Sequence, residues 1–248
     1  MSLSVYTLVT GAFGGLGTAI VRRLIEDGQQ VIATDRRIED GDAWLEGFKD
    51  PLRQHILMRS LDVTKLEEIE SLRDELRVQD IHVDRLVNNA GVASAAPPWS
   101  INPKTFDIVL KVNLHGTFYC TRTFSEPMVK AGFGRIVNFA SLYAFAPGAG
   151  QSPYAAAKAG IIGYTHSIAL DLAAHGITCN VIAPGLIWHE RLEGVLPEEE
   201  YAAMEQMTPM KRRGEPREIA GTVSFLLSDD ASFMTGQTLH VNGGVYLN

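Results

Sequence analysis

Short runs of consecutive apolar residues alternate with longer segments of helical periodicity along the 248-residue chain. The apolar runs predict strands over residues 5–10, 31–34, 55–61, 84–87, 135–140, 178–183 and 239–242. Strands that are apolar at consecutive positions are typical of parallel sheets covered on both faces. The clearest predicted helices cover residues 65–78, 105–130, 154–174 and 216–227. This alternation predicts one α/β domain over residues 1–248, with a doubly wound parallel sheet of about seven strands.

The segment 186–214 is the least regular part of the chain, and we expect it to cover the substrate side of the domain. It contains an acidic stretch at residues 197–200, followed by Met204, Met207 and Met210 at three-residue spacing. Apolar residues at this spacing more often pack a helix inward than form a recognition surface. The pattern therefore predicts a helix with buried methionines.

Composition and charge exclude several classes of function. The formal net charge is −7, so the basic balance typical of a nucleic-acid-binding protein is absent. Residues 1–6 lack the basic start and apolar run of a secretory signal, and no run of about eighteen apolar residues predicts a membrane span. Cys120 and Cys179 have no metal-type spacing and lie in apolar surroundings, which predicts buried free thiols. We therefore expect a soluble, cytoplasmic protein that binds no nucleic acid, membrane or metal.

A glycine-rich loop joins the first predicted strand to the first predicted helix. Gly11, Gly15 and Gly17 lie in this loop, and Asp35 ends the next strand. The order of strand, glycine loop, helix, strand and acid is that of a dinucleotide-binding βαβ unit, although Ile20 breaks the strict G-x-G-x-x-G spacing. Glycines let the backbone approach a pyrophosphate, whose charge is met by amides at the helix start. Asp35 is placed to accept hydrogen bonds from the ribose hydroxyls of an adenosine.

Tyr154 and Lys158 are four residues apart on a predicted Ala-rich helix, so their side chains share one face. A lysine ammonium near a phenol favours the phenolate, which predicts a lowered pKa for Tyr154. Tyr154 would then donate and accept a proton near neutral pH. The pair alone fits an ordinary helix surface equally well, so its interpretation depends on the rest of the chain.

Further motifs occur in a fixed order around this pair. They are T-G-x-x-x-G-x-G at 10–17, N-N-A-G at 88–91, Asn113, Ser141, Y-x-x-x-K at 154–158 and P-G at 184–185. The series resembles the classical short-chain dehydrogenase/reductase family over nearly the whole chain. The resemblance implies a single-domain Rossmann fold and an oxidoreductase that uses a nicotinamide cofactor.

The resemblance also implies a role for each matching residue. Tyr154 would pass a proton to or from the substrate oxygen, and Ser141 would hydrogen-bond the same oxygen. Lys158 would hold the nicotinamide ribose and lower the Tyr154 pKa, while Asn113 would support Lys158 through a water molecule. The implied cofactor-binding residues are Gly11, Phe13, Gly14, Gly15, Leu16, Gly17, Asp35, Arg36, Asp62, Val63, Asn89, Ala90, Gly91, Tyr154, Lys158, Pro184, Gly185 and Ile187.

Asp35 carries our prediction of the cofactor. Its carboxylate suits a free ribose 2′-hydroxyl and would repel the 2′-phosphate of NADP. In NADP-preferring relatives a basic residue often precedes the second motif glycine, whereas this chain has Gly14 there. Arg36 and Arg37 argue the other way, because either could meet a phosphate if Asp35 turned away. We predict NAD(H) as the cofactor, with NADP as the less favoured alternative.

The predicted substrate pocket surrounds Ser141 and Tyr154. Its predicted lining is Ser94, Ser141, Tyr143, Gln151, Tyr154, Trp188 and His189. In the family, a threonine that touches the nicotinamide amide often stands where this chain has His189. His189 could replace that contact, contact the substrate or face the solvent, and the sequence leaves these alternatives open. The aromatic residues predict a pocket of mixed polarity, and we expect a small alcohol or ketone as substrate.

Two other functions compete with this one. The C-terminal third is similar to 3-oxoacyl-carrier-protein reductases, notably over 211–220 and 235–244. Those enzymes use NADPH and dock an acidic carrier through basic residues near the ends of two long helices. This chain offers only Lys130 and His175 there and has a net charge of −7, so we rank that function second. A non-catalytic regulatory protein ranks third, because such proteins typically lose the tyrosine or the lysine.

The family usually forms homotetramers through its two long helices. The predicted helices over 105–130 and 154–174 are apolar enough to agree with this assembly, because a monomer would expose their apolar faces to water. We therefore expect a homotetramer.

Overall fold

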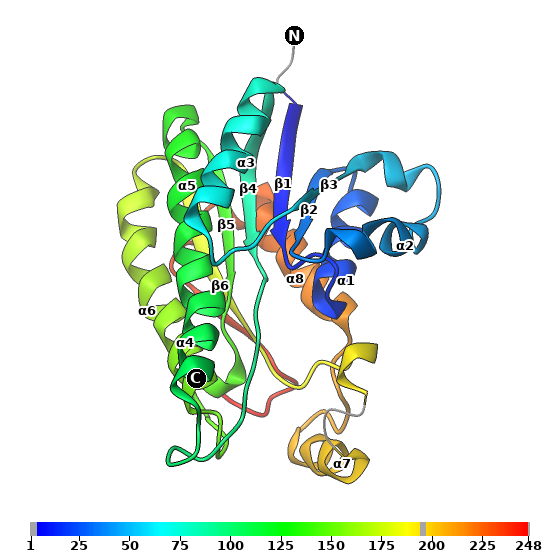
Figure 1. Ribbon diagram of the computed structural model, residues 1–248, viewed down its shortest axis with the longest axis vertical. Coiled ribbons are helices and arrows are strands. Elements are labelled where there is room, and N and C mark those ends of the chain that lie inside the picture. Colours follow the sequence, from blue (N-terminus) through cyan, green and yellow to red (C-terminus); the bar gives the residue numbers. More distant parts are fainter. Residues whose placement is uncertain (1–3, 194–196, 248) are drawn as a thin grey trace.

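The computed structural model describes residues 4–193 and 197–247. Residues 1–3 of the N-terminal stretch, residues 194–196 of the predicted substrate-side segment, and residue 248 lie outside the described residues. A seven-stranded parallel sheet, in the order β3-β2-β1-β4-β5-β6-β7, forms the centre (Figure 1). Its strands are β1 (Ser4–Thr10), β2 (Gln30–Asp35), β3 (Ile56–Ser60), β4 (Ile81–Asn88), β5 (Gly134–Phe139), β6 (Ile177–Pro184) and β7 (Thr238–Val241). The predicted doubly wound parallel sheet is confirmed.

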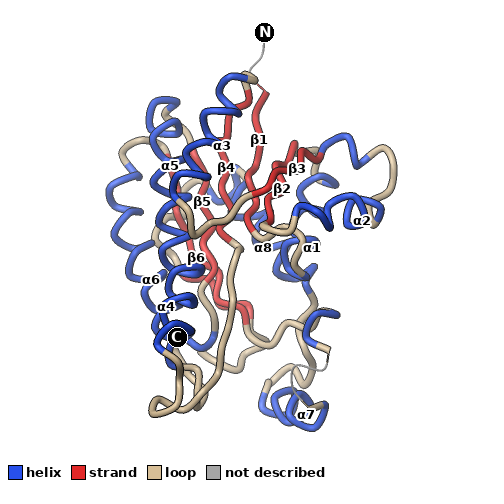
Figure 2. Tube along the Cα trace, viewed as in Figure 1, coloured by secondary structure: helices blue, strands red, loops and turns tan. Residues whose placement is uncertain are grey.

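Helices cover both faces of the sheet (Figure 2). One face carries α1 (Gly15–Glu26) and α8 (Pro216–Leu227), which pack against each other. The other face carries α3 (Leu66–Val78), α4 (Pro103–Leu110), α5 (Gly116–Ala131) and α6 (Ser152–Ala173). The short α2 (Gly41–Glu46) lies between β2 and β3 in the chain, and α7 (Glu198–Met207) stands away from the sheet. Short 3₁₀ turns cover Ile38–Asp40, Leu52–His55, Leu142–Ala144, Glu190–Leu192 and Asp229–Ala231.

The sheet separates two hydrophobic clusters. Val9 belongs to the cluster under α1 and α8, and its neighbour Leu8 belongs to the cluster under α3 and α5. Successive residues of a strand point to opposite faces, so both are buried and the strand is apolar at consecutive positions. Cys120 and Cys179 lie in the second cluster as buried free thiols, which confirms their prediction. Burial raises the pKa of Cys120 to about 12, because it disfavours the thiolate.

The predicted long helix over 105–130 is divided by a π-helical turn. This turn, Lys111–His115, separates α4 from α5 and contains Asn113. The Asn113 amide nitrogen donates to the Val109 carbonyl at 2.9 Å and to the Val92 carbonyl at 2.8 Å. Periodicity does not reveal such a turn, because a single wide turn leaves the apolar pattern on both sides intact. π-helical turns are frequent at functional sites.

The strand order reverses direction at β1, which has β2 on one side and β4 on the other. In sheets of this kind, ligands bind at the carboxyl ends of the strands at the reversal point. The glycine loop follows β1 and Asn89 follows β4, so both lie at this point. The Asn89 side chain donates to the carbonyls of Thr10 and Gly11, each at 3.0 Å. Asn89 therefore fixes the shape of the glycine loop from the neighbouring strand.

We expect Gly17→Ala to lower the free energy of unfolding by about 2 kcal/mol. A β-carbon at position 17 would collide with the Gly11 carbonyl oxygen and lie 2.8 Å from the Ala12 α-carbon, and backbone atoms cannot rotate away. Gly163→Ala is the matched control, because nothing lies within 4 Å of its β-carbon position in α6. This control should be neutral or stabilising. Urea unfolding of both variants measures the difference, and equal stabilities would contradict the prediction.

The prediction of inward-facing methionines in the segment 186–214 is wrong for Met207 and Met210, whereas Met204 is half-buried. Met207 is 74% exposed and Met210 is 60% exposed. The only buried residue of α7 is Tyr201, whose ring lies 5.0 Å from the Arg213 guanidinium. Because α7 stands off the sheet, its methionines do not pack against the sheet. Tyr201, which lies beside Arg213, anchors the helix instead.

Candidate active site

Ser141 and Tyr154 meet at the carboxyl edge of the sheet. Ser141 lies two residues beyond the end of β5, and Tyr154 lies in the first turn of α6. The Ser141 side chain lies beside the Tyr154 phenol, and its oxygen accepts the Tyr143 amide at 3.2 Å. The rings of Tyr143 and Tyr154 are nearly perpendicular, with centroids 6.4 Å apart. Three of the predicted site residues are therefore brought into contact.

Lys158 lies one helical turn beyond Tyr154 and is buried. Its ammonium is 5.5 Å from the centroid of the Tyr154 ring and donates to the Phe139 carbonyl at 2.8 Å. Burial lowers the pKa of Lys158 to about 7, and burial also raises the pKa of Tyr154. In the chain alone, Lys158 therefore does not lower the Tyr154 pKa as predicted, because burial disfavours the charged form of both groups.

The lowered pKa of Lys158 should make stability depend on pH. The unfolded lysine binds a proton up to a pKa near 10.5, whereas the folded lysine does so only to about 7. The unfolded state therefore binds more protons between these values, and the free energy of unfolding should rise with pH by at most about 1.4 kcal/mol per pH unit. Urea unfolding at pH 7, 8 and 9 should show this rise in the parent chain and its loss in Lys158→Met. Lys104→Met, at an exposed position, is the control and should keep the rise of the free energy of unfolding with pH. If this free energy rose equally with pH in the parent chain and in Lys158→Met, the lowered pKa of Lys158 would be contradicted.

Asn113 and Gly91 lie beside Lys158. A β-carbon at position 91 would lie 2.7 Å from the Asn113 side-chain oxygen and 3.6 Å from the Lys158 nitrogen. Among the described residues, this buried Asn113 oxygen has no hydrogen-bond partner. A buried acceptor beside a lysine suits an ordered water molecule. The predicted water-mediated support of Lys158 by Asn113 is thus sterically reasonable and stays a prediction.

A cavity of about 500 Å³ opens at the reversal point of the sheet. It is lined by twelve of the predicted cofactor-binding residues, namely Gly11, Gly14, Gly15, Leu16, Gly17, Asp35, Arg36, Asp62, Val63, Asn89, Ala90 and Gly91. Five further lining residues are not among the predicted cofactor-binding residues, namely Arg37, Leu61, Val92, Val112 and His189. Of these, His189 was predicted on the substrate side, and Arg37 was considered as a contact for a 2′-phosphate. Leu61 and Val92 are sequence neighbours of predicted residues, so a wider window around each motif would have included them.

The start of α1 lines this cavity, and its first amides are available to an anion. The helix begins at Gly15 after Gly14, which gives no side-chain cap, and its first turn holds no acidic residue. The first amides of a helix have no partner within the helix, and the helix dipole adds positive potential. The glycine loop leaves these amides accessible to a pyrophosphate. The residues present therefore fit a dinucleotide.

Asp35 also lines the cavity, and its carboxylate is held in a fixed orientation beside the glycine loop. Its carboxylate accepts the Phe13 amide at 3.3 Å and the Arg37 amide at 3.1 Å. The Arg37 guanidinium lies 3.8 Å from the same carboxylate, whose side chain is only 13% exposed. Two backbone amides thus fix the carboxylate at the cavity wall, which disfavours the alternative in which Asp35 turns away.

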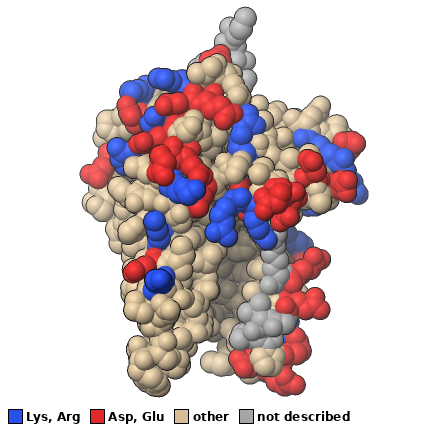
Figure 3. Space-filling model, in the orientation of Figure 1, with Lys and Arg blue, Asp and Glu red and all other residues tan. Residues whose placement is uncertain are grey.

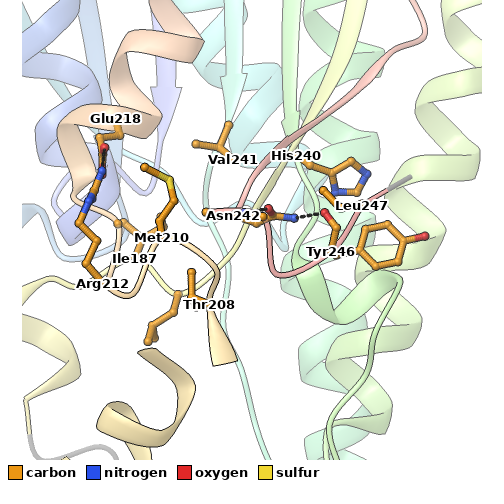
Figure 4. Close-up of a pocket in the computed structure, with 14 residues that line it drawn as sticks. Ile187, Thr208, Met210, Arg212, Glu218, His240, Val241, Asn242, Tyr246 and Leu247 are labelled. Atoms are coloured by element: carbon orange, nitrogen blue, oxygen red, sulfur yellow. Dashed lines mark hydrogen bonds and ion pairs between the residues drawn. The ribbon is translucent and has the colours of Figure 1, made fainter. Parts of the chain in front are cut away.

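Several predicted cofactor residues lie elsewhere. The Phe13 side chain is 2% exposed and packs on Trp44, with ring centroids 4.5 Å apart, because the residue serves the core under α1. The lining of the glycine-rich cavity does not include Tyr154, Lys158, Pro184, Gly185 or Ile187. Ile187 instead lines a second cavity of about 460 Å³, shown in Figure 4, between the segment 208–214 and the C-terminal residues. There Arg212 and Glu218 form an ion pair at 2.6 Å.

The predicted substrate residues divide into two groups. Tyr143 lies against Tyr154, and Gln151 immediately precedes α6. Trp188, in contrast, is held under α7, with Arg213 4.6 Å above its ring and Tyr201 5.1 Å from its centroid. Ser94 lies in the loop between β4 and α4 and is partly buried. The structure therefore does not place Trp188 among the residues that surround Tyr154, because it contributes to the anchor of α7.

His189 lies in the glycine-rich cavity and packs against the glycine loop. A β-carbon at position 15 would lie 2.6 Å from the His189 β-carbon and 2.7 Å from its Nδ1. Of the three alternatives left open for His189, this contact disfavours the one in which the side chain only faces the solvent. Sequence alone gave no sign of this contact, because residues 15 and 189 are brought together only by the fold.

The face shown in Figure 3 is hollowed between the part that carries α7 and the part that carries α4 and α6. Acidic side chains gather over α7, whose first turn holds Glu198, Glu199 and Glu200. The α7 side of this hollow is therefore acidic. Among the described residues, no helix combines the length and hydrophobicity that a bilayer span requires.

Comparisons with known proteins agree with this geometry. Residues 11–246 match a family model described as Enoyl-(Acyl carrier protein) reductase. The chain is 39% identical over 239 residues to nodulation protein G of Azospirillum brasilense, covering 96% of each chain. It is 37% identical over 241 residues to the 3-oxoacyl-[acyl-carrier-protein] reductase FabG of Haemophilus influenzae, covering 97% of this chain and 98% of the relative.

Solved structures give the same result. A crystal structure from Agrobacterium tumefaciens, assigned as a gluconate dehydrogenase, superposes with a TM-score of 0.92 at 30% identity, covering 100% of this chain and 97% of the other. The structure of ElxO with NADP bound gives a TM-score of 0.91 at 27% identity, covering 98% of both chains. The chain belongs to the short-chain dehydrogenase/reductase family and is an oxidoreductase that acts on alcohol or keto groups with a nicotinamide cofactor.

Proposed function

We propose that the protein is an NAD(H)-dependent dehydrogenase that interconverts a small secondary alcohol and its ketone. The observation that carries this proposal is the grouping of Ser141 and Tyr154 beside the buried Lys158. Gly91 links this group to the cavity, because it lines the cavity and lies next to Lys158. A proton donor is thus placed beside a site that fits a dinucleotide.

Each residue of the group has a separate task in the proposed reaction. The nicotinamide supplies the hydride for ketone reduction and accepts it in alcohol oxidation. In the direction of reduction, Tyr154 donates its phenolic proton to the substrate oxygen, and Ser141 holds that oxygen by a hydrogen bond. Lys158, with its pKa lowered to about 7, exchanges a proton near neutral pH and returns one toward Tyr154. Asn113 holds a water molecule that supports this exchange.

The choice of NAD(H) rests on Asp35. Its carboxylate is fixed at the cavity wall by the amides of Phe13 and Arg37, where the ribose of the bound cofactor would meet it. A 2′-phosphate would meet this negative charge in a partly buried position, where Coulomb repulsion is strong. ElxO was solved with NADP, and Arg36 and Arg37 line the cavity, so NADP is the alternative that the experiments below must exclude.

The second candidate function is reduction of 3-oxoacyl groups on an acyl carrier protein with NADPH. The likeness to the FabG reductase of Haemophilus influenzae favours it. The acidic first turn of α7 and the net charge of −7 oppose it, because these charges would repel an acidic carrier. The complete set of Ser141, Tyr154 and Lys158 opposes a non-catalytic regulatory function.

A screen of substrates and cofactors tests the proposal. Small ketones and alcohols are assayed with NADH and NAD, and side by side with NADPH and NADP. We expect turnover of free ketones or alcohols with NADH or NAD. Efficient NADPH-dependent reduction of acetoacetyl thioesters, with NADH much poorer, would overturn this ranking in favour of the carrier-protein reductase.

We propose a homotetramer as the assembled form, built on the long helices. Ile108 of α4, Phe118 of α5 and Leu170 of α6 are 44%, 41% and 81% exposed in the single chain. Large apolar side chains on neighbouring helices favour burial against another copy of the chain. Sedimentation equilibrium should give about four times the mass of one chain, and a stable monomer would refute the assembly.

A further inference from the structure

Trp44 of α2 packs on the side chain of Phe13, which belongs to the glycine loop. The centroids of the two rings lie 4.5 Å apart, and the indole also meets the ring of Phe48, with 4.7 Å between centroids. The indole Nε1 donates a hydrogen bond to the Thr18 hydroxyl of α1 at 2.8 Å. Two aromatic contacts and one hydrogen bond therefore define the position of Trp44 against the glycine loop.

The backbone of Phe13 connects this aromatic contact to Asp35. The Phe13 amide donates to the Asp35 carboxylate at 3.3 Å, and the preceding Ala12 amide donates to the Thr34 carbonyl at 2.9 Å. The Phe13 ring is buried in the core under α1. Because the ring and the amide belong to one residue, a ring that is fixed against Trp44 also fixes the direction of the amide. Trp44 thus acts on the carboxylate through Phe13, although Trp44 does not line the cavity itself.

We propose that Trp44 is a positioning residue for the choice between NAD and NADP, and this assignment rests on the proposed function. With the Phe13 amide in place, the Asp35 carboxylate stays at the cavity wall and repels a 2′-phosphate. Without the indole, the Phe13 ring loses its support and the amide is no longer held. The carboxylate is then free to turn toward the Arg37 guanidinium, which already lies 3.8 Å away. A 2′-phosphate would meet less negative charge there.

The test measures by calorimetry how tightly the chain binds ADP-ribose and 2′-phospho-ADP-ribose, which are fragments of the two cofactors. We expect Trp44→Leu, which keeps an apolar side chain but removes the ring, to lower the preference for ADP-ribose by about tenfold, because one hydrogen bond to a charged group is weakened. Trp44→Phe keeps a ring against Phe13 and should restore most of this preference. Trp99→Leu is the matched control, because Trp99 is 86% exposed in the loop between β4 and α4, and it should keep the parental preference.

A double-mutant cycle separates positioning of Asp35 from a general loss of packing. In an Asp35→Ser background, Trp44→Leu should leave the preference between the two fragments unchanged, because the carboxylate that Trp44 positions is gone. Two results would overturn the assignment alone: Trp44→Leu weakens both fragments equally or not at all, or it lowers the preference as much without Asp35 as with it. A parent chain that binds neither fragment, or binds 2′-phospho-ADP-ribose more tightly, would overturn the proposed function and this assignment with it.

Discussion

Tyr154→Phe should lower kcat by about 10²- to 10⁴-fold while NADH binding changes by less than about twofold. The substitution removes only the hydroxyl that lies beside Ser141 and keeps the ring that lies against Tyr143 and Lys158. The substrate oxygen then lacks a proton donor, although Ser141 can still hold it. Steady-state kinetics with the substrate from the screen, together with calorimetry of NADH, measures the two effects.

Tyr164→Phe is the matched control for this experiment. Tyr164 lies in the same helix α6, and its hydroxyl hydrogen-bonds Thr121 rather than a residue of the proposed site. We expect this variant to keep the parental kcat, with a small loss of stability from the lost hydrogen bond. If Tyr154→Phe retained more than about a tenth of the parental kcat, Tyr154 would not be the proton donor.

Asp35→Ser should reduce the preference for NAD over NADP by about 100-fold, which corresponds to about 2.7 kcal/mol. The substitution removes the negative charge that faces the ribose, and it leaves Arg36 and Arg37 in the cavity lining to meet a 2′-phosphate. The ratio of kcat/KM for the two cofactors measures the effect. The parent chain should prefer NAD, and the variant should approach equal use of both cofactors.

Asp40→Ser is the matched control for Asp35→Ser. It also removes one negative charge near Arg37, but at a position outside the cavity. Asp40 also lies near Arg37, with the guanidinium 3.8 Å from its carboxylate, but it is 54% exposed and does not belong to the cavity lining. We expect this variant to keep the parental cofactor ratio. A parent chain that uses NADPH better than NADH, or a shift as large in Asp40→Ser as in Asp35→Ser, would show that Asp35 does not select the cofactor.

The apolar pattern and the short motifs determined the fold class and the members of the site. Leu8 and Val9 illustrate the reason for the fold, because burial on both faces of a parallel sheet requires apolar residues at consecutive positions. Tyr154 and Lys158 share one helical face by spacing alone. The glycine loop and Asp35 are at strand ends, which in this topology meet at one edge of the sheet.

Tertiary structure decided the contacts between distant segments and the properties that depend on burial. Sequence spacing predicted that Lys158 would lower the Tyr154 pKa, but burial lowers the Lys158 pKa to about 7 and raises that of Tyr154. Met207 was predicted to face inward, but α7 stands off the sheet and leaves it exposed. His189 and Gly15 are far apart in the chain and meet only after β1 and β6 are placed in the same sheet. Local pattern therefore determined the fold and most residues of the candidate site, whereas packing decided the remaining members, what each side chain touches and how readily it carries a charge.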